Sequence, residues 1–390
     1  MRIIDVKTFV LKQPTGPSGP AYGAEGPAGA ERPDPGYFTR PPWRSLYSAR
    51  METLLVRLTT DDGHQGWGEA LAPVAPEVVA AIVDRMLGPW LTGRDPRAVR
   101  PLWDAMRDLM RERGHLTGHQ ADAMAALDIA LWDLHGRITG LPVAQLLGGA
   151  YRTGIPAYVS GLAEPTDELR AALAARLAAE GATTVKLAAG HGVEADLATY
   201  DAVAAAAPGV RIALDAHWVY SLADALRLGR ELDRRGALFF EAPIAPEDIE
   251  GHRELAARIA TPVAVGECLR NRYEFRDWIT RRALRVAQPD VARTGLTEAA
   301  AVAAIADAHH VPVAHHHSVG LGVSLAAGLH ASAAAADCPF FEYQPGPLPY
   351  AQRILRTPIT AGPAGFVLPE GPGLGIEIDT ETVERLAEES

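Results

Sequence analysis

The feature that most constrains the fold is an alternation of short apolar runs with longer Ala/Leu/Arg-rich stretches, which begins near residue 150. The longer stretches, among them Asp167–Ala179, have helical periodicity, and strand–helix alternation of this kind is typical of parallel βαβ units. Eight strand candidates predict an α/β fold built on a (β/α)8 barrel, with its chemistry at the carboxyl ends of the strands. The candidates are Ile155–Val159, Thr183–Leu187, Arg211–Leu214, Ala237–Phe240, Pro262–Val265, Leu284–Ala287, Val311–Ala314 and Phe340–Tyr343.

The first part of the chain has a different character. A strand at Ile3–Leu11 is followed by a Pro/Gly-rich segment, and strands at Glu52–Thr59 and Gln65–Ala70 flank the hairpin signal Asp61-Asp62-Gly63. We therefore expect an α+β capping domain over residues 1–122 and the barrel over residues 123–360. Residues 361–390 lose the alternation, and we expect them to form a short strand at Ile376–Ile378 and to return to the capping domain.

The Pro/Gly-rich segment, residues 13–42, is long for a connection without regular structure. Such loops are usually functional lids or disordered, and both alternatives stay open here. As a lid it would close over a small anionic ligand with the side chains of Tyr22, Tyr37, Phe38, Arg40, Trp43 and Arg44.

Composition narrows the class of protein. A formal net charge of −11 argues against a nucleic-acid binder. Two cysteines, Cys268 and Cys338, build no disulfide framework. No signal-peptide pattern or membrane-length apolar stretch is visible, so we expect a cytoplasmic enzyme. Phosphate-loop, Rossmann and Gly-x-Ser-x-Gly motifs are also missing, which disfavours nucleotide-binding and hydrolase functions.

Three acidic residues stand at the ends of successive strand candidates. Asp215, Glu241 and Glu267 are spaced at equal intervals, one βα unit apart. Singly, each would be an N-cap or a surface charge, but together they would converge at the barrel mouth and repel one another without a cation. All-oxygen ligation suits Mg²⁺. The pattern therefore predicts a magnesium site.

Candidates for proton transfer lie beside these acids. Lys186, on the second strand, would have its pKa lowered by a neighbouring divalent cation; the alternative is a surface lysine. His217 lies two residues after Asp215 and would face the same cavity if the strand continued. There it could protonate a leaving hydroxyl, or serve only as a hydrogen-bonding neighbour.

The last three strands also end in ionisable residues. Asp290 ends the sixth, and an aspartate that fixes a histidine's tautomer makes that histidine a better base. His315, His316 and His317 end the seventh, and the pattern does not choose among them. Glu342 ends the eighth, where it would either stay protonated in an apolar mouth and donate to an oxyanion, or pair with an arginine.

With these residues in place, the chain resembles the mandelate racemase/muconate lactonizing enzyme family of the enolase superfamily. The most specific segment runs from Ala123 through Leu127-Asp128-Ile129-Ala130-Leu131-Trp132-Asp133 to Gly149. Gly66-Trp67-Gly68-Glu69-Ala70 and Pro372-Gly373-Leu374-Gly375 are also similar to the family's sequences.

The resemblance implies a capping domain, a modified barrel and one Mg²⁺ held by Asp215, Glu241 and Glu267. It also implies that Asp290 pairs with His317, because the sequence after that residue, up to His330, resembles the family's stretch after its catalytic histidine. His316 is the alternative. Glu342 matches the acid that contacts the substrate carboxylate or the enolate, and relatives suggest a homo-oligomer.

Two departures from the family pattern suggest the reaction. Many relatives carry Lys-x-Lys on the second strand, but Ala188 stands where the second lysine would be. Asp215-x-His217, in place of Asp-x-Asn, resembles sugar-acid dehydratases of the galactonate and mannonate types. We therefore expect dehydration of a sugar acid to a 2-keto-3-deoxy acid, with His317 as base and His217 as acid. The alternatives are a racemase, epimerase or lactone cycloisomerase using Lys186, and, more remotely, a non-catalytic barrel that binds a metal and an acid.

Overall fold

The computed structural model describes residues 1–14, 36–162 and 164–390. Its capping domain is built on a three-stranded antiparallel sheet in the order β1 (Ile3–Pro14), β4 (Arg50–Thr60), β5 (Gln65–Ala70). Hydrogen bonds between Thr60 and His64 close the predicted hairpin, with Gly63 at a φ of 88° in its turn. A positive φ of this kind favours glycine.

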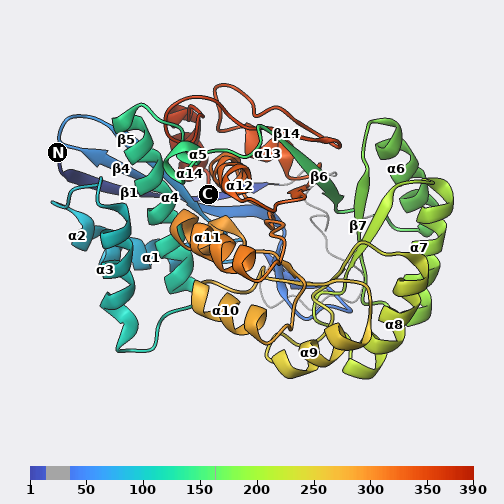
Figure 1. Ribbon diagram of the computed structural model, residues 1–390. Coiled ribbons are helices and arrows are strands. Elements are labelled where there is room, and N and C mark those ends of the chain that lie inside the picture. The colour runs from blue at the N-terminus through green and yellow to red at the C-terminus, as the bar shows by residue number, and fades with distance from the viewer. Residues whose placement is uncertain (15–35, 163) are drawn as a thin grey trace.

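Four helical segments follow the sheet: α1 (Pro76–Ile82), the π-helix η1 (Val83–Leu87), α2 (Gly88–Leu91) and α3 (Val99–Arg111). The next helix, α4 (His119–Thr139), packs between β5 and the barrel helix α11 (Val291–Ala308). Because α4 has neighbours on both sides, all of its residues from Ala123 to Leu134 are buried. The capping sheet and the barrel therefore share this helix as a common support (Figure 1).

The barrel has the predicted parallel architecture. Its strands are hydrogen-bonded in the order of the chain, and β12 (Phe341–Tyr343) pairs in parallel with β6 (Gly154–Ser160). The expected fold class, a (β/α)8-type barrel with a capping domain, is confirmed. The strands between these two are β7 (Thr184–Ala188), β8 (Arg211–Asp215), β9 (Phe240–Glu241), β10 (Val263–Val265) and β11 (Val286–Ala287).

Helices cover the outside of the barrel, with α6 to α9 forming the side away from the capping domain (Figure 1). Several begin at side-chain caps, which satisfy N–H groups in the first turn; Thr166 caps α6, Ser221 caps α8 and Asn271 caps α10. The ranges are α5 (Val143–Leu146), α6 (Asp167–Ala179), α7 (Val193–Ala206), α8 (Leu222–Arg235), α9 (Ile249–Arg258), α10 (Arg272–Thr280) and α12 (Gly322–Ala334).

Two predicted strands differ from the structure. The seventh candidate, Val311–Ala314, forms an isolated bridge from Val313 to Ala287 instead of a full strand. Ile376–Ile378 is also no strand, and Ile378 only bridges to Leu355. The C-terminal segment instead forms α13 (Leu348–Gln352), the hairpin β13 (Ala361–Gly362) and β14 (Gly365–Val367), and α14 (Thr380–Glu388), which packs on β1.

The segment between β1 and β4 contains a short hairpin, which we call the cap hairpin: β2 (Tyr37–Thr39), β3 (Leu46–Ser48) and their connection. It brings Arg40 and Trp43 to the barrel mouth, whereas Arg44 is exposed and Phe38 is buried against Tyr47. Tyr22 lies outside the described residues. Among the described residues, no helix is long and apolar enough to cross a membrane.

Candidate active site

The three predicted metal ligands meet at the carboxyl ends of adjacent strands. Asp215 ends β8 and lies beside Glu241, which ends β9. Glu267 follows β10 after Gly266, where a Cβ would lie 2.5 Å from the Gln288 backbone, so only glycine fits. Asp215 and Glu241 are buried. The equal spacing in the sequence thus corresponds to neighbouring positions around one cavity.

Lys186 lies at the base of this group. Its Nζ is 3.0 Å from both carboxylate oxygens of Glu241, 3.0 Å from Glu342 Oε1 and 3.5 Å from Asp215 Oδ2. Burial opposes the charged form, but the Glu241 and Glu342 carboxylates outweigh burial and hold the pKa of Lys186 well above its usual value. The prediction that Lys186 points inward is confirmed, and the alternative of a surface lysine is wrong.

The donor set fits a divalent cation. Ligand atoms of two predicted ligands, Glu241 and Glu267, lie within 4.8 Å of one another and of a His316 ring nitrogen, whereas Asp215 is not part of this close group. Burial raises the pKa of Glu241 to about 8, and the neighbouring carboxylates Asp215, Glu342 and Glu267 add to this against the pull of Lys186. Three carboxylates, those of Asp215, Glu241 and Glu342, surround the one ammonium group of Lys186, and a divalent cation with oxygen ligands would relieve this excess of negative charge.

The histidine that pairs with Asp290 is His316, so the predicted pair with His317 is wrong. His316 Nδ1 lies 2.6 Å from Asp290 Oδ2, while the other oxygen of Asp290 accepts a hydrogen bond from the Ala292 N–H and caps α11. A parallel bridge sets residue 316 beside residue 290. Successive side chains of an extended chain point to opposite sides, so the side chain of residue 317 points away.

The other ring nitrogen of His316 faces the acids. Nε2 lies 3.2 Å from Glu267 Oε2 and 3.7 Å from Glu342 Oε2. Burial works against the imidazolium, yet Glu342, Asp290 and Glu267 together hold the pKa of His316 well above its usual value. His316 thus stands between its orienting aspartate and the predicted metal ligands.

The neighbouring histidines are packed elsewhere. The His317 ring stacks on Phe341 with 5.6 Å between ring centroids, and burial lowers its pKa to about 4. His315 Nδ1 is 3.0 Å from Ser332 Oγ in the interior. Only the His317 backbone N–H touches the acids, donating to Glu342 Oε2 at 3.1 Å. The side chains of His315 and His317 therefore pack in the interior.

The His217 side chain reaches the cavity from a turn, and not from the continued strand that was predicted. The strand stops at Asp215, and both His217 and Trp218 adopt positive φ values, 48° and 64°. The His217 ring still lines the cavity, with Nδ1 3.2 Å from the Asp215 carbonyl oxygen. Trp218 donates from Nε1 to Glu267 Oε1 at 3.1 Å.

Glu342 is ionised in this arrangement. Burial would raise its pKa, but Lys186 and His316 outweigh burial and lower the pKa to about 2. The expected protonated carboxyl in an apolar mouth is therefore wrong, and so is the expected arginine partner, because the cation at Glu342 is Lys186.

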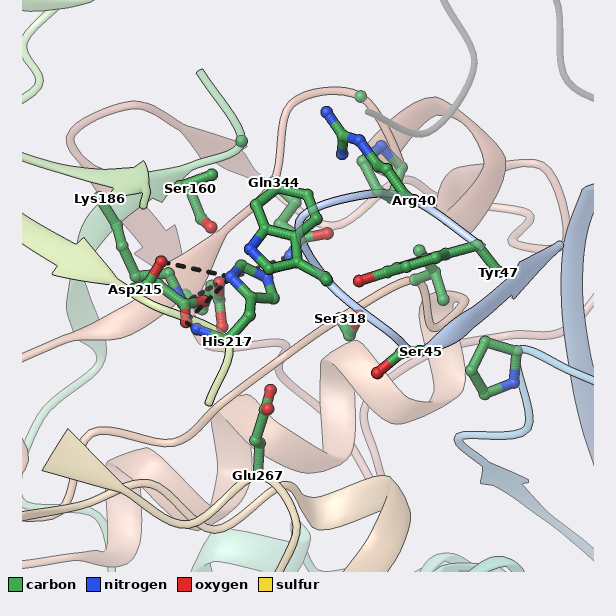
Figure 2. Close-up of a pocket in the computed structure, with 18 of the residues that line it drawn as sticks. Arg40, Ser45, Tyr47, Ser160, Lys186, Asp215, His217, Glu267, Ser318 and Gln344 are labelled. Carbon is green, nitrogen blue, oxygen red and sulfur yellow. Dashed lines mark hydrogen bonds and ion pairs between the residues drawn. The ribbon is translucent and has the colours of Figure 1, made fainter. Parts of the chain in front are cut away.

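The cavity above these residues measures about 630 Å³. This falls within the range of pockets that take small organic ligands. Lys186, Asp215 and His217 lie on one side of it, Arg40, Ser45 and Tyr47 of the cap hairpin on the other, and Glu267 below (Figure 2). The barrel and the capping domain thus build the site together.

Comparisons with known proteins agree with this geometry. Residues 39–148 match the mandelate racemase/muconate lactonizing enzyme N-terminal domain, and residues 168–383 match the enolase C-terminal domain-like model. The chain belongs to the enolase superfamily. Within it, the chain is 34% identical to D-galactarolactone cycloisomerase of Agrobacterium fabrum, over 87% of this chain and 92% of that protein.

Two further relatives of this superfamily protein support the assignment. Arabinonate dehydratase of Saccharolobus solfataricus is 32% identical, over 86% of this chain and 90% of its own. A crystal structure from Sinorhizobium meliloti has 38% identity and a TM-score of 0.93, covering 99% of each chain. The chain is therefore an enzyme whose relatives are named for dehydration and for cycloisomerisation.

Sequence reasoning missed several cavity residues of this superfamily member. His191, Trp218 and Arg293 lie in loops or at a helix start, where no strand pattern marks them. Arg293 forms no ion pair with the described residues, and its buried Nε lacks a partner there. The signal that could have found them is closeness along the chain to singled-out residues, since His191 and Arg293 lie three residues after Ala188 and Asp290, and Trp218 lies directly after His217.

Proposed function

We propose that this enzyme removes the proton next to the carboxylate of a sugar acid and then expels the hydroxyl on the neighbouring carbon, giving a 2-keto-3-deoxy acid. The observation that carries the proposal is that His316, which pairs with Asp290, and His217 line one cavity together with the carboxylates of Asp215, Glu267 and Glu342. This supplies one base and one acid, which is what an elimination requires.

Asp215, Glu241 and Glu267 are the residues that would hold Mg²⁺. When bound, the ion supplies Lewis-acid stabilisation of the negative charge that develops on the substrate carboxylate. Lys186 lies among these acids and adds positive charge at the same end of the cavity. Glu342 is proposed to fix Lys186 and the backbone at residue 317 through its two oxygens.

The base is proposed to be His316 in its neutral form, which a cation held by Glu267 would favour by offsetting a carboxylate that raises the pKa of the histidine. Asp290 accepts from Nδ1–H, which leaves Nε2 as the atom that takes the α-proton. His217 then donates a proton to the departing oxygen as the carbon–oxygen bond breaks and a carbon–carbon double bond forms. This step releases water and leaves an enol, which tautomerises to the 2-keto acid.

A second candidate is favoured by the relative named D-galactarolactone cycloisomerase. If the expelled oxygen belongs to a ring, the same steps open the ring and no water is lost, so the product is an isomer of the substrate. A lactone ring releases a carboxylate, which needs less help from an acid than a hydroxyl does. His217 should therefore matter more for dehydration than for ring opening.

The experiment is a mass-spectrometric screen of sugar acids, di-acids and their lactones with the enzyme and Mg²⁺ in D2O. Loss of water with a 2-keto product supports dehydration, and ring opening at constant formula supports the cycloisomerase. Deuterium at the α-carbon without either change would contradict elimination and favour a racemase or epimerase, with Lys186 as the next residue to replace. For a hydroxy-acid substrate, His217→Asn should slow elimination at least tenfold more than it does for a lactone.

A further inference from the structure

The cap hairpin delivers one aromatic side chain directly onto His217. Trp43 is buried at 3% exposure, and its ring stacks on His217 with 4.4 Å between centroids and 30° between planes. Its Nε1–H donates to the Ala189 carbonyl oxygen at 3.0 Å, just beyond the end of β7. Trp43 is thus a contact from the capping domain onto the proposed acid.

The end of β7 is shaped to receive this indole. Ala188, the last residue of β7, lines the cavity, and Ala189 and Gly190 follow it. Gly190 has a φ of 107°, and a Cβ there would lie 3.1 Å from Trp43 Nε1. The missing side chain at residue 190 therefore leaves room for the Trp43 indole.

Two further side chains contact the Trp43 ring. The Arg40 guanidinium carbon lies 4.6 Å from the Trp43 ring centroid, a distance typical of a cation–π contact. The His191 ring meets Trp43 edge-on at 5.9 Å. The indole is therefore fixed by the hairpin and by the barrel, so it can act as a rigid wall.

His217 needs such a wall, because its own backbone does not fix its ring. Its left-handed φ is unfavourable for a residue with a side chain, and such strain persists only where surrounding contacts enforce it. The His217 N–H donates to Asp215 Oδ1 at 3.0 Å, and Nδ1 is 3.2 Å from the Asp215 carbonyl oxygen. Those contacts hold one edge of the ring, and Trp43 holds one face.

We propose that Trp43 is a positioning residue that holds the His217 ring in the orientation needed to protonate the departing oxygen. This inference rests on the proposed function, in which His217 is the acid. Trp43 should then matter for the expulsion of the oxygen and not for the removal of the α-proton, which His316 carries out on its own contacts.

The test compares Trp43→Leu, Trp43→Phe and the control Trp90→Phe, which alters a half-buried tryptophan of α2 in the capping domain. Product formation and deuterium uptake into recovered substrate are measured in D2O with the substrate found in the screen. Trp43→Leu should slow product formation by about 10- to 100-fold, within the range of general acid catalysis. Deuterium uptake should persist or rise, because the intermediate returns to substrate when expulsion is slow.

The matched variants separate positioning from general damage. Trp43→Phe keeps a stacking ring and should retain most of the rate, and Trp90→Phe should behave as the wild type does. In a His217→Asn background, Trp43→Leu should slow product formation little further, because the effects of two substitutions are not additive when one residue acts through the other. Equal losses of product formation and deuterium uptake, or full additivity with His217→Asn, would overturn the proposal.

Failure of the proposed function would be recognised separately. If the wild-type enzyme expels no oxygen from any substrate, elimination is wrong, and the contact itself is then tested by fluorescence. An imidazole stacked on an indole quenches its emission, so His217→Ala should raise emission in the protein that has Trp43. The same change in the Trp43→Phe background should have no effect, and an equal rise in both would show that the rings do not stack.

Discussion

At the residue scale, the identity of the base depends on which histidine shares a bridge with Asp290. His316 does so, and its Nε2 points toward Glu267. We expect His316→Asn to lower α-proton exchange and turnover by at least ~10²-fold, the lower range of general base catalysis. His317→Asn should cost activity much less. The measurement is deuterium uptake at the α-carbon together with steady-state rates.

Folding controls keep this comparison interpretable. Both variants should retain the wild-type circular dichroism, and Mg²⁺ affinity should stay within a few-fold of wild type for His317→Asn. A larger loss of proton exchange from His317→Asn than from His316→Asn would contradict the assignment of the base and restore the pairing expected from family resemblance.

The sequence contained a signal that identifies this histidine. Asp290 and His316 are 26 residues apart, the interval that also separates Asp215, Glu241 and Glu267. Glu342 lies at the same interval after His316. Within each of the two runs, from Asp215 to Glu267 and from Asp290 to Glu342, βα units of one length therefore place the residues at equivalent heights, whereas resemblance in the following segment pointed one residue too far. Side-chain charge states, such as the ion pair of Glu342 with Lys186, could not be predicted because they depend on three-dimensional neighbours.

At the element scale, the contact between β5 and α4 depends on missing side chains. A Cβ on Gly68 would lie 1.8 Å from the Ala126 carbonyl oxygen, and one on Gly66 would lie 2.4 Å from that of Ala130. We expect Gly68→Ala to lower the free energy of unfolding by about 2–3 kcal/mol or more, because the helix must move away from the strand. Urea denaturation followed by circular dichroism measures the change.

Gly154→Ala is the matched control for this substitution. Gly154 also lies in a strand, but its φ is not positive and no atom lies within 4 Å of a Cβ placed there. Its effect should stay within about 0.5 kcal/mol, as for other surface changes. If Gly68→Ala proved equally mild, the close approach of β5 to α4 would be wrong.

Element prediction succeeded where a periodic pattern was long enough. Residues 65–70 and 167–179 were expected as the strand and helix that the structure contains. The seventh barrel strand is reduced to isolated bridges, because backbone hydrogen bonds there depend on partners that local composition does not specify. The cap hairpin was expected only as a lid or a disordered loop, since the contact of Trp43 with Ala189 joins residues far apart in the chain.

At the scale of the whole molecule, buried histidines make stability depend on pH. His330 in α12 is fully buried, its Nδ1 accepts from the Ala144 N–H at 3.2 Å, and burial lowers its pKa to about 4. The unfolded chain, with a histidine pKa near 6.5, binds the proton first as pH falls. Stability is therefore lost between about pH 6.5 and pH 4, by up to ~1.4 kcal/mol per pH unit for this group.

His330→Asn, which keeps an acceptor for the Ala144 N–H, should remove this part of the acid dependence. Between pH 7.5 and pH 4.5 the loss of unfolding free energy should shrink by about 2–3 kcal/mol relative to wild type. The exposed His115→Asn is the control and should leave the curve unchanged. The measurement is urea denaturation at both pH values, and parallel curves for His330→Asn and wild type would show that His330 is not held neutral by burial.

Binding of Mg²⁺ should also reach the whole molecule, because its ligands come from strands that close the barrel. An ion that binds only the folded state stabilises it by about 2.7 kcal/mol at a concentration 100 times its Kd. We expect saturating Mg²⁺ to raise the melting temperature by several degrees and a chelator to reverse the shift.

Glu267→Gln, which removes a ligand from the partly exposed edge of the site, should abolish most of the shift, whereas the surface variant Asp104→Asn should keep it. Because each protein is compared with itself with and without Mg²⁺, any loss of intrinsic stability cancels. A full shift in Glu267→Gln would mean that the ion binds elsewhere and that the three strand-end carboxylates are not its site.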